Sequence, residues 1–117
     1  MPRFSRKIVP AAFFRTETGS EPVRDWLKEL LPEDRRIIGA DVRTVEFGWP
    51  VGMPVCRPMG QGLFEVRSTI TGNRIARILF CFHEGTMLLL HGFVKKKGKI
   101  PAADLAIALK RRKEVEK

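Results

Sequence analysis

The sequence predicts one α+β domain over residues 1–117, in which an antiparallel sheet is covered by helices on one face. Apolar residues recur at helical spacing between Ser20 and Phe47, and from Leu63 onward they form extended runs instead. Short turns separate these extended runs, as is typical of antiparallel neighbours. The length of 117 residues suits one hydrophobic core and is too short for two.

The first half of the chain is expected to form a strand and a helical hairpin. Residues 7–15 are short and apolar, and Pro10 favours the edge or the start of a strand, because proline cannot donate to a ladder. A helix over residues 20–31 opens with a Ser-Glu-Pro start signal, and a second helix follows over residues 33–47. Residues 48–62 are rich in proline and glycine, so we expect a loop there.

The second half is expected to form a three-stranded meander and a final helix. Strands over residues 63–70, 74–82 and 86–94 are separated by a Thr-Gly-Asn turn and a His-Glu-Gly turn. The final helix covers residues 101–114, and its cluster of cations lies at the C-terminal end, where the helix dipole favours positive charge.

Composition and charge narrow the class of partner. A net charge of +9 and a pI near 10.3 predict an anionic partner, which is nucleic acid, an acidic protein or a membrane surface. No apolar run approaches the roughly 20 residues of a membrane helix, so we expect a cytoplasmic protein without a membrane partner. Cys56, expected in a loop, and Cys81, expected in the core, lack metal-binding spacing. We therefore expect no disulfide, no metal and no cofactor.

Basic residues gather on the predicted meander. Arg67 and Arg77 lie before and after one tight turn, so they can be near neighbours across the hairpin, and Arg74 begins the second strand. Arg77 interrupts an otherwise apolar strand, and a charged residue at such a position needs a structural or functional explanation. The alternative is a solvated sheet face, or an ion pair between Arg67 and Glu65.

A second group occurs where the last strand leaves the core, in residues 88–99. An apolar run is followed there by the candidate residues His91, Lys95, Lys96, Lys97 and Lys99. A histidine in an apolar strand is usually a core or sheet-face residue, and a run of lysines is usually a solvated turn. Their joint occurrence beside Arg77 favours a site that binds a phosphate backbone, with its side chains positioned by a rigid strand. Arg57 is a weaker candidate, because its glycine-containing loop matches no phosphate-loop spacing.

The motifs that are missing limit the chemistry. The chain has no HExxH, GxSxG or Rossmann glycine pattern, and it has no tyrosine. Candidate catalytic groups are therefore cationic or imidazole groups. Such groups suit RNA cleavage, in which the 2′-hydroxyl of the substrate attacks the neighbouring phosphate. The protein then has to orient that group, move protons and stabilise the extra negative charge.

Three stretches together resemble the RelE/HigB toxin superfamily, and above all its phage-related HigB-type branch: Gly62–Arg67, Arg74–Phe80 and Leu88–Pro101. The helical hairpin before them is also in the order of that family. The resemblance implies a RelE-like fold and the toxin of a type II toxin–antitoxin system. It further implies a metal-independent endoribonuclease that cleaves messenger RNA, commonly on the ribosome, and a cognate helix-turn-helix antitoxin as partner.

Carried over by position, the resemblance implies roles for the basic residues. The implied catalytic residues are Arg77, as main stabiliser of the transition state, with His91, Lys95 and Lys96. The implied RNA-binding residues are Arg57, Arg67, Arg74, Lys97 and Lys99. Members of the family often carry tyrosines that this chain lacks, so the general base is not identified. A non-catalytic nucleic-acid-binding protein and a structural protein, both of phage origin, are the alternatives.

Overall fold

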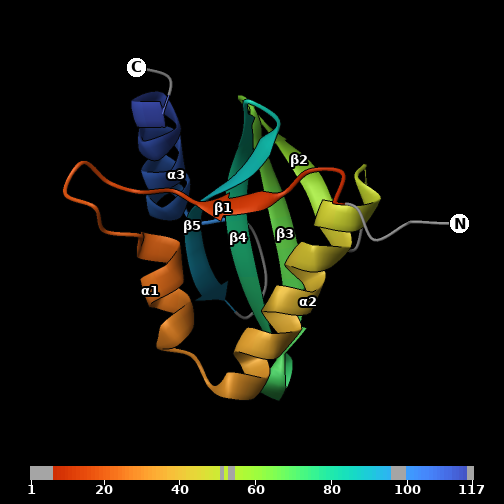
Figure 1. The fold of residues 1–117 in the computed structure, drawn as a ribbon. Coiled ribbons are helices and arrows are strands. Elements are labelled where there is room, and N and C mark those ends of the chain that lie inside the picture. Colours follow the sequence, from red (N-terminus) through yellow and green to blue (C-terminus); the bar gives the residue numbers. More distant parts are fainter. Residues whose placement is uncertain (1–6, 51, 53–54, 96–99, 116–117) are drawn as a thin grey trace, which may run out of the picture.

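The computed structural model describes residues 7–50, 52, 55–95 and 100–115, which form a five-stranded mixed sheet with helices on both faces (Figure 1). The elements are β1 (Ala11–Phe13), α1 (Pro22–Lys28), α2 (Pro32–Gly48), β2 (Cys56–Gly60), β3 (Leu63–Ile70), a 3₁₀ turn (Thr71–Asn73), β4 (Arg74–His83), β5 (Thr86–Lys95) and α3 (Ala102–Val115). The strand order is β1-β5-β4-β3-β2. The predicted α+β class is confirmed, and the meander β3–β4–β5 lies where the sequence predicts it.

The connector over residues 48–62 contains a strand, so the prediction of a loop there is wrong. β2 pairs antiparallel with β3, with Cys56 opposite Val66. Its proline is tolerated because β2 lies at the edge of the sheet. Cys56 is therefore not a loop residue, and its side chain is buried in the core. Burial, together with the negative charge of Glu65, raises the pKa of the Cys56 thiol to about 11.

The opposite edge of the sheet is not antiparallel. β1 follows Pro10 and is an edge strand, as Pro10 predicts, but it pairs parallel with β5, with Ala12 opposite Leu88. A parallel pair requires a long connection, and here α1, α2 and the strands β2 to β4 intervene between the two partners. The purely antiparallel sheet of the sequence prediction is corrected at this edge.

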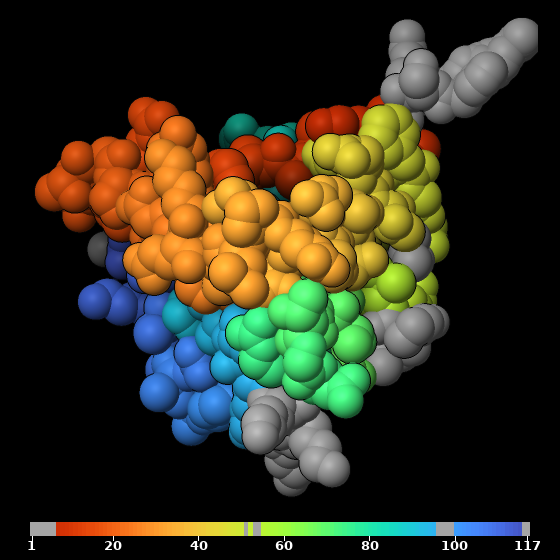
Figure 2. Space-filling view, turned by 90° about the horizontal axis from the view of Figure 1, so that it is seen from below, coloured from red at the N-terminus to blue at the C-terminus, as the bar shows by residue number. Residues whose placement is uncertain are grey.

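The helices cover both faces of the sheet and not one, which corrects a second expectation. The end-on view shows α1 and α2 on one side and α3 on the other (Figure 2). The cluster on the side of α1 and α2 includes Val23, Ile38 and Ile78, whereas the cluster under α3 includes Leu79 and Ala108. β4 is buried on both faces, which explains its nearly continuous apolar sequence.

The contact between α1 and β5 depends on a glycine. A Cβ atom on Gly92 would overlap the ring of Trp26, so only glycine allows the helix to approach this part of the strand. Trp26 is therefore a packing residue. Within the described part of the chain, no helix has both the length and the apolar character to span a membrane.

Candidate active site

The strand register collects four of the six predicted site residues that the structure describes in two neighbouring rows across the sheet. The first row consists of Arg57, Glu65, Leu79 and His91, and the second consists of Arg67, Arg77 and Phe93. Directly paired residues share a face, as do residues two apart along a strand, so both rows lie on the face that α3 covers in part. We call the charged and imidazole members, Arg57, Glu65, Arg67, Arg77 and His91, the basic site. The prediction that Arg67 and Arg77 are cross-hairpin neighbours is confirmed.

A bulge in β5 places His91 on this face. Leu79 pairs with His91 whereas the next residue of β4, Phe80, pairs with Leu89, so Leu90 is the extra residue. Leu90 packs into the core under α3. Regular alternation would therefore turn His91 to the opposite face, away from Arg77. Arg111 of α3 donates from Nη1 to the carbonyl oxygen of Leu90 at 2.8 Å, which satisfies the bulge backbone.

Glu65 is a fully buried carboxylate between two arginines. Its Oε1 accepts a hydrogen bond from Nε of Arg57 at 2.7 Å, and its Oε2 lies 3.3 Å from Nη1 of Arg77. The alternative in which Glu65 pairs with Arg67 is therefore wrong. Glu65 was not among the predicted site residues, although a single carboxylate within an apolar strand is a usable signal, because a buried charge requires partners.

Arg77 carries the most unusual environment of the site. Its side chain is only 2% exposed, and burial lowers the pKa of its guanidinium. The charge of Glu65 opposes this shift, whereas Arg67 and Arg57 add to it. Within the described residues, Nε and Nη1 of Arg77 and Oε2 of Glu65 make no hydrogen bond, since the 3.3 Å contact is poorly aligned. Buried donors without acceptors are rare and costly, and phosphate oxygens are acceptors that would satisfy them.

His91 is held by a carboxylate of α3. Its Nε2 lies 2.7 Å from Oδ1 of Asp104, and the ring stacks on Phe93 with centroids 5.6 Å apart. Both side chains of the pair are largely buried. Sequence reasoning missed Asp104, because an acidic residue in the first turn of a helix is explained by the helix dipole alone.

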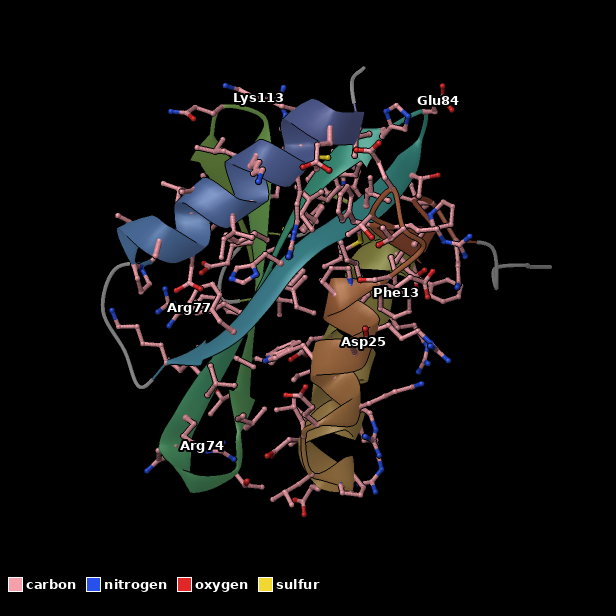
Figure 3. The ribbon with its side chains drawn as sticks, turned by 90° about the vertical axis from the view of Figure 1, so that its left-hand side faces the viewer. Phe13, Asp25, Arg74, Arg77, Glu84 and Lys113 are labelled. Atoms are coloured by element: carbon pink, nitrogen blue, oxygen red, sulfur yellow. The ribbon has the colours of Figure 1, made fainter. Side chains whose placement is uncertain are left out.

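The remaining predicted residues are distributed as follows. Lys95 lies opposite Ile75 at the end of β5, on the same face as Arg77. Lys96, Lys97 and Lys99 lie outside the described residues. Arg74 is not brought to the basic site: it lies on the opposite face of the sheet, at the tip of the β3–β4 hairpin, whereas Arg77 lies near the start of α3 (Figure 3).

The arrangement can bind an anion and move a proton. The three arginines, whose charge one carboxylate partly compensates, favour binding of a phosphate. The imidazole of His91 lies in the row next to that of Arg67 and Arg77 and can move a proton. Across the described ranges, no cluster of three or more histidine, cysteine, aspartate and glutamate side chains could hold a metal ion. The described groups at this site are arginine N–H donors, the imidazole of His91 and the carboxylates of Glu65 and Asp104.

Comparison with known families gives a match over the part of the chain that contains the basic site. A family model described as phage derived protein Gp49-like (DUF891) matches residues 25–113. This range runs from α1 into the last turns of α3, and it includes every residue of the basic site as well as Asp104. That family is related to the RelE/HigB-like toxins. No match was found among curated proteins.

Proposed function

The chain belongs to the Gp49-like family of phage-derived proteins, and on this premise we propose that it is a toxin that cleaves messenger RNA. The observation that carries the proposal is Arg77, whose buried guanidinium has two N–H groups without an acceptor among the described residues. It lies directly beside Arg67 and one row from His91. A phosphodiester is the ligand that best matches this combination of fixed donors and an imidazole.

The proposed reaction is an internal transfer at phosphorus. The 2′-hydroxyl oxygen of one nucleotide attacks the adjacent phosphorus, and the 5′-oxygen of the next nucleotide leaves. His91 takes the proton of the 2′-hydroxyl, and the ammonium group of Lys95 gives a proton to the leaving oxygen. The products are a 2′,3′-cyclic phosphate and a free 5′-hydroxyl. Proton exchange with water restores both side chains.

The arginines divide the work of stabilising the phosphate. Arg67 is partly exposed and is proposed to hold the phosphate in the ground state, with Arg57 nearby. Arg77 lies deeper and is proposed to donate to the oxygens that gain charge in the transition state, where one donor contributes roughly 10²- to 10³-fold in rate. Because Arg77 is 2% exposed, the side chains over it must move aside when RNA binds. Glu65 compensates the charge of Arg77 and accepts no hydrogen bond from the Nε and Nη1 groups that lack an acceptor among the described residues.

The family resemblance extends the proposal to partners. We place the protein in the HigB-type branch of type II toxins, with cytoplasmic messenger RNA on the ribosome as substrate. Lys96 is proposed as a further catalytic group, and Lys97 and Lys99 as contacts to RNA. A helix-turn-helix antitoxin encoded beside the gene is the proposed inhibitor.

The test combines ribosomes with a chemically altered message. Purified protein is added to translating ribosomes, and cut sites and end groups are mapped on the message. We expect cuts ending in a 2′,3′-cyclic phosphate, and no cut where the attacking nucleotide carries a 2′-deoxy sugar. Equal cleavage of the deoxy message would contradict the mechanism. Binding of RNA without any cut would favour the non-catalytic alternative.

A further inference from the structure

Helix α3 contacts two consecutive residues of β5 at the bulge. Arg111 binds the backbone carbonyl of Leu90 at 2.8 Å, and Asp104 binds the ring of His91 at 2.7 Å. Asp104 and Arg111 are seven residues apart, so they lie on the same side of the helix, separated by two turns. The Arg111 contact fixes the backbone next to His91, and the Asp104 contact fixes the side chain of His91.

The contact with Asp104 determines which ring nitrogen is left for other partners. An ionised carboxylate only accepts hydrogen bonds, so the proton of a neutral imidazole lies on Nε2 when that nitrogen faces Asp104. Nδ1 is then an acceptor, and it becomes a donor once the ring takes up a proton. We infer that Asp104 is a positioning residue that fixes the tautomer and orientation of His91, so that Nδ1 exchanges the proton with RNA.

This inference rests on the proposed function, since His91 transfers a proton only if the protein cleaves RNA. The strand register supports its location. Arg77 pairs with Phe93, two residues beyond His91, so Arg77 and His91 are diagonal neighbours whose Cα atoms are about 7–8 Å apart in a typical sheet. A phosphate held by Arg77 is therefore within reach of the ring.

The other side of His91 is unsuited to RNA. His91, Gly92 and Arg111 line a cleft of about 290 Å³ together with Asp25 of α1 and Glu29, which directly follows α1. These two carboxylates repel phosphate, so RNA is expected to approach His91 from the arginine side. Imidazole is also the only side-chain type of the basic site that exchanges a proton readily near neutral pH.

The functional arm of the test compares two carboxylates near His91. In Asp104→Ala, kcat for RNA cleavage should fall by about 100-fold, the lower end of the range for general acid–base catalysis, with KM unchanged. Asp104→Glu, which keeps the carboxylate, should recover most of the rate. The matched control is Asp25→Ala, which removes a carboxylate of the same cleft that makes no hydrogen bond or ion pair with His91, and it should leave kcat unchanged.

The spectroscopic arm reads the ring directly, without RNA. The chain has two histidines, so a His83→Gln background leaves His91 as the only imidazole. With ¹⁵N-labelled protein at a pH high enough to keep the ring neutral, we expect a slowly exchanging proton on Nε2 and none on Nδ1. In Asp104→Ala that proton should exchange too fast to be observed, and both tautomers should be populated.

The two experiments distinguish a failure of the inference about Asp104 from a failure of the proposed function. A ring signal that Asp104→Ala does not change, or a proton on Nδ1, overturns the inference. A lost ring signal with unchanged cleavage overturns it as well, while the proposed function stands. A wild-type protein that retains the ring signal and cuts no message contradicts the proposed function itself. A fall in kcat that Glu reverses, together with a lost ring signal in Asp104→Ala, supports the inference.

Discussion

Two ion-paired groups lie on β4, one around Arg74 and the other around Arg77, three residues further along. Arg74 donates from Nη2 to Oδ2 of Asp34 at 2.8 Å and from Nε to the carbonyl oxygen of Thr71 at 3.0 Å. Asp34 also accepts from the backbone N–H and the hydroxyl of Thr71. This network joins the tip of the β3–β4 hairpin to the first turn of α2.

The group around Arg77 also pairs arginine with a buried carboxylate, but its hydrogen bonding is less complete. One oxygen of Glu65 accepts a hydrogen bond from Arg57. The other oxygen of Glu65 and two N–H groups of Arg77 make no hydrogen bond among the described residues. A satisfied network such as that of Arg74 stabilises the fold. A buried network with free donors costs stability, and it is expected where a ligand completes it.

The largest expected difference between the two groups is in the rate of RNA cleavage after substitution of each arginine. Arg77→Lys keeps the charge and removes the planar fork of donors, so the single-turnover rate should fall by about 10²- to 10³-fold. The matched control, Arg74→Lys, should cleave at the wild-type rate per folded molecule, because Arg74 lies on the other face of the sheet. Equal rates for the two variants would contradict the assignment of a ligand-binding role to Arg77.

The second effect concerns stability and its pH dependence at the Arg74 group. The backbone N–H of Thr71 lowers the pKa of Asp34, burial opposes this shift, and the Thr71 hydroxyl and Arg74 lower it further. The folded state therefore holds the proton less tightly than the unfolded state, whose carboxyl titrates near pH 3.9. The resulting stability is fully present above that pH and is lost as the pH falls through the lower, folded-state pKa.

Asp34→Asn should accordingly lower the thermal unfolding midpoint by several degrees at pH 7. The difference from the wild type should shrink as the pH falls below about 4, since the wild type loses its carboxylate there. Thermal melts over pH 2.5–7 provide the measurement, and cleavage per folded molecule should not change. A midpoint difference that is the same at every pH would show that the charge of Asp34 does not stabilise the fold.

Sequence reasoning predicted both arginines as RNA contacts, and its limits explain why. The bounds of β3 and the pairing of Arg67 with Arg77 follow from one turn and from alternation, which are local signals. The partner of Arg74 is 40 residues away in α2, so no local pattern reveals it. The bulge at Leu90, which moves His91 to the face of Arg77, likewise depends on packing against α3.

The third effect is a salt dependence of RNA affinity. Each phosphate contact to a single strand contributes about 0.7 to the slope of log affinity against log salt concentration. Arg67→Ala should reduce the magnitude of this slope by about that amount, whereas Arg74→Ala should leave it unchanged, because the Arg74 guanidinium is already bound to Asp34. Fluorescence anisotropy of a labelled RNA from 50 to 300 mM salt measures both. Identical slopes for Arg67→Ala and the wild type would exclude a phosphate contact at Arg67.

The smallest effect tests whether Glu65 is charged, on which the contrast between the two groups depends. Burial is the main cause that raises the pKa of the Cys56 thiol to about 11, and the negative charge of Glu65 is the second. Glu65→Gln should therefore lower that pKa, while burial keeps it above its ordinary value. Alkylation rates against pH in a Cys81→Ala background report it, and Asp34→Asn, which alters the distant carboxylate, should leave it unchanged. An unchanged thiol pKa in Glu65→Gln would mean that Glu65 is neutral, and Arg77 would then be a buried cation without a charged partner.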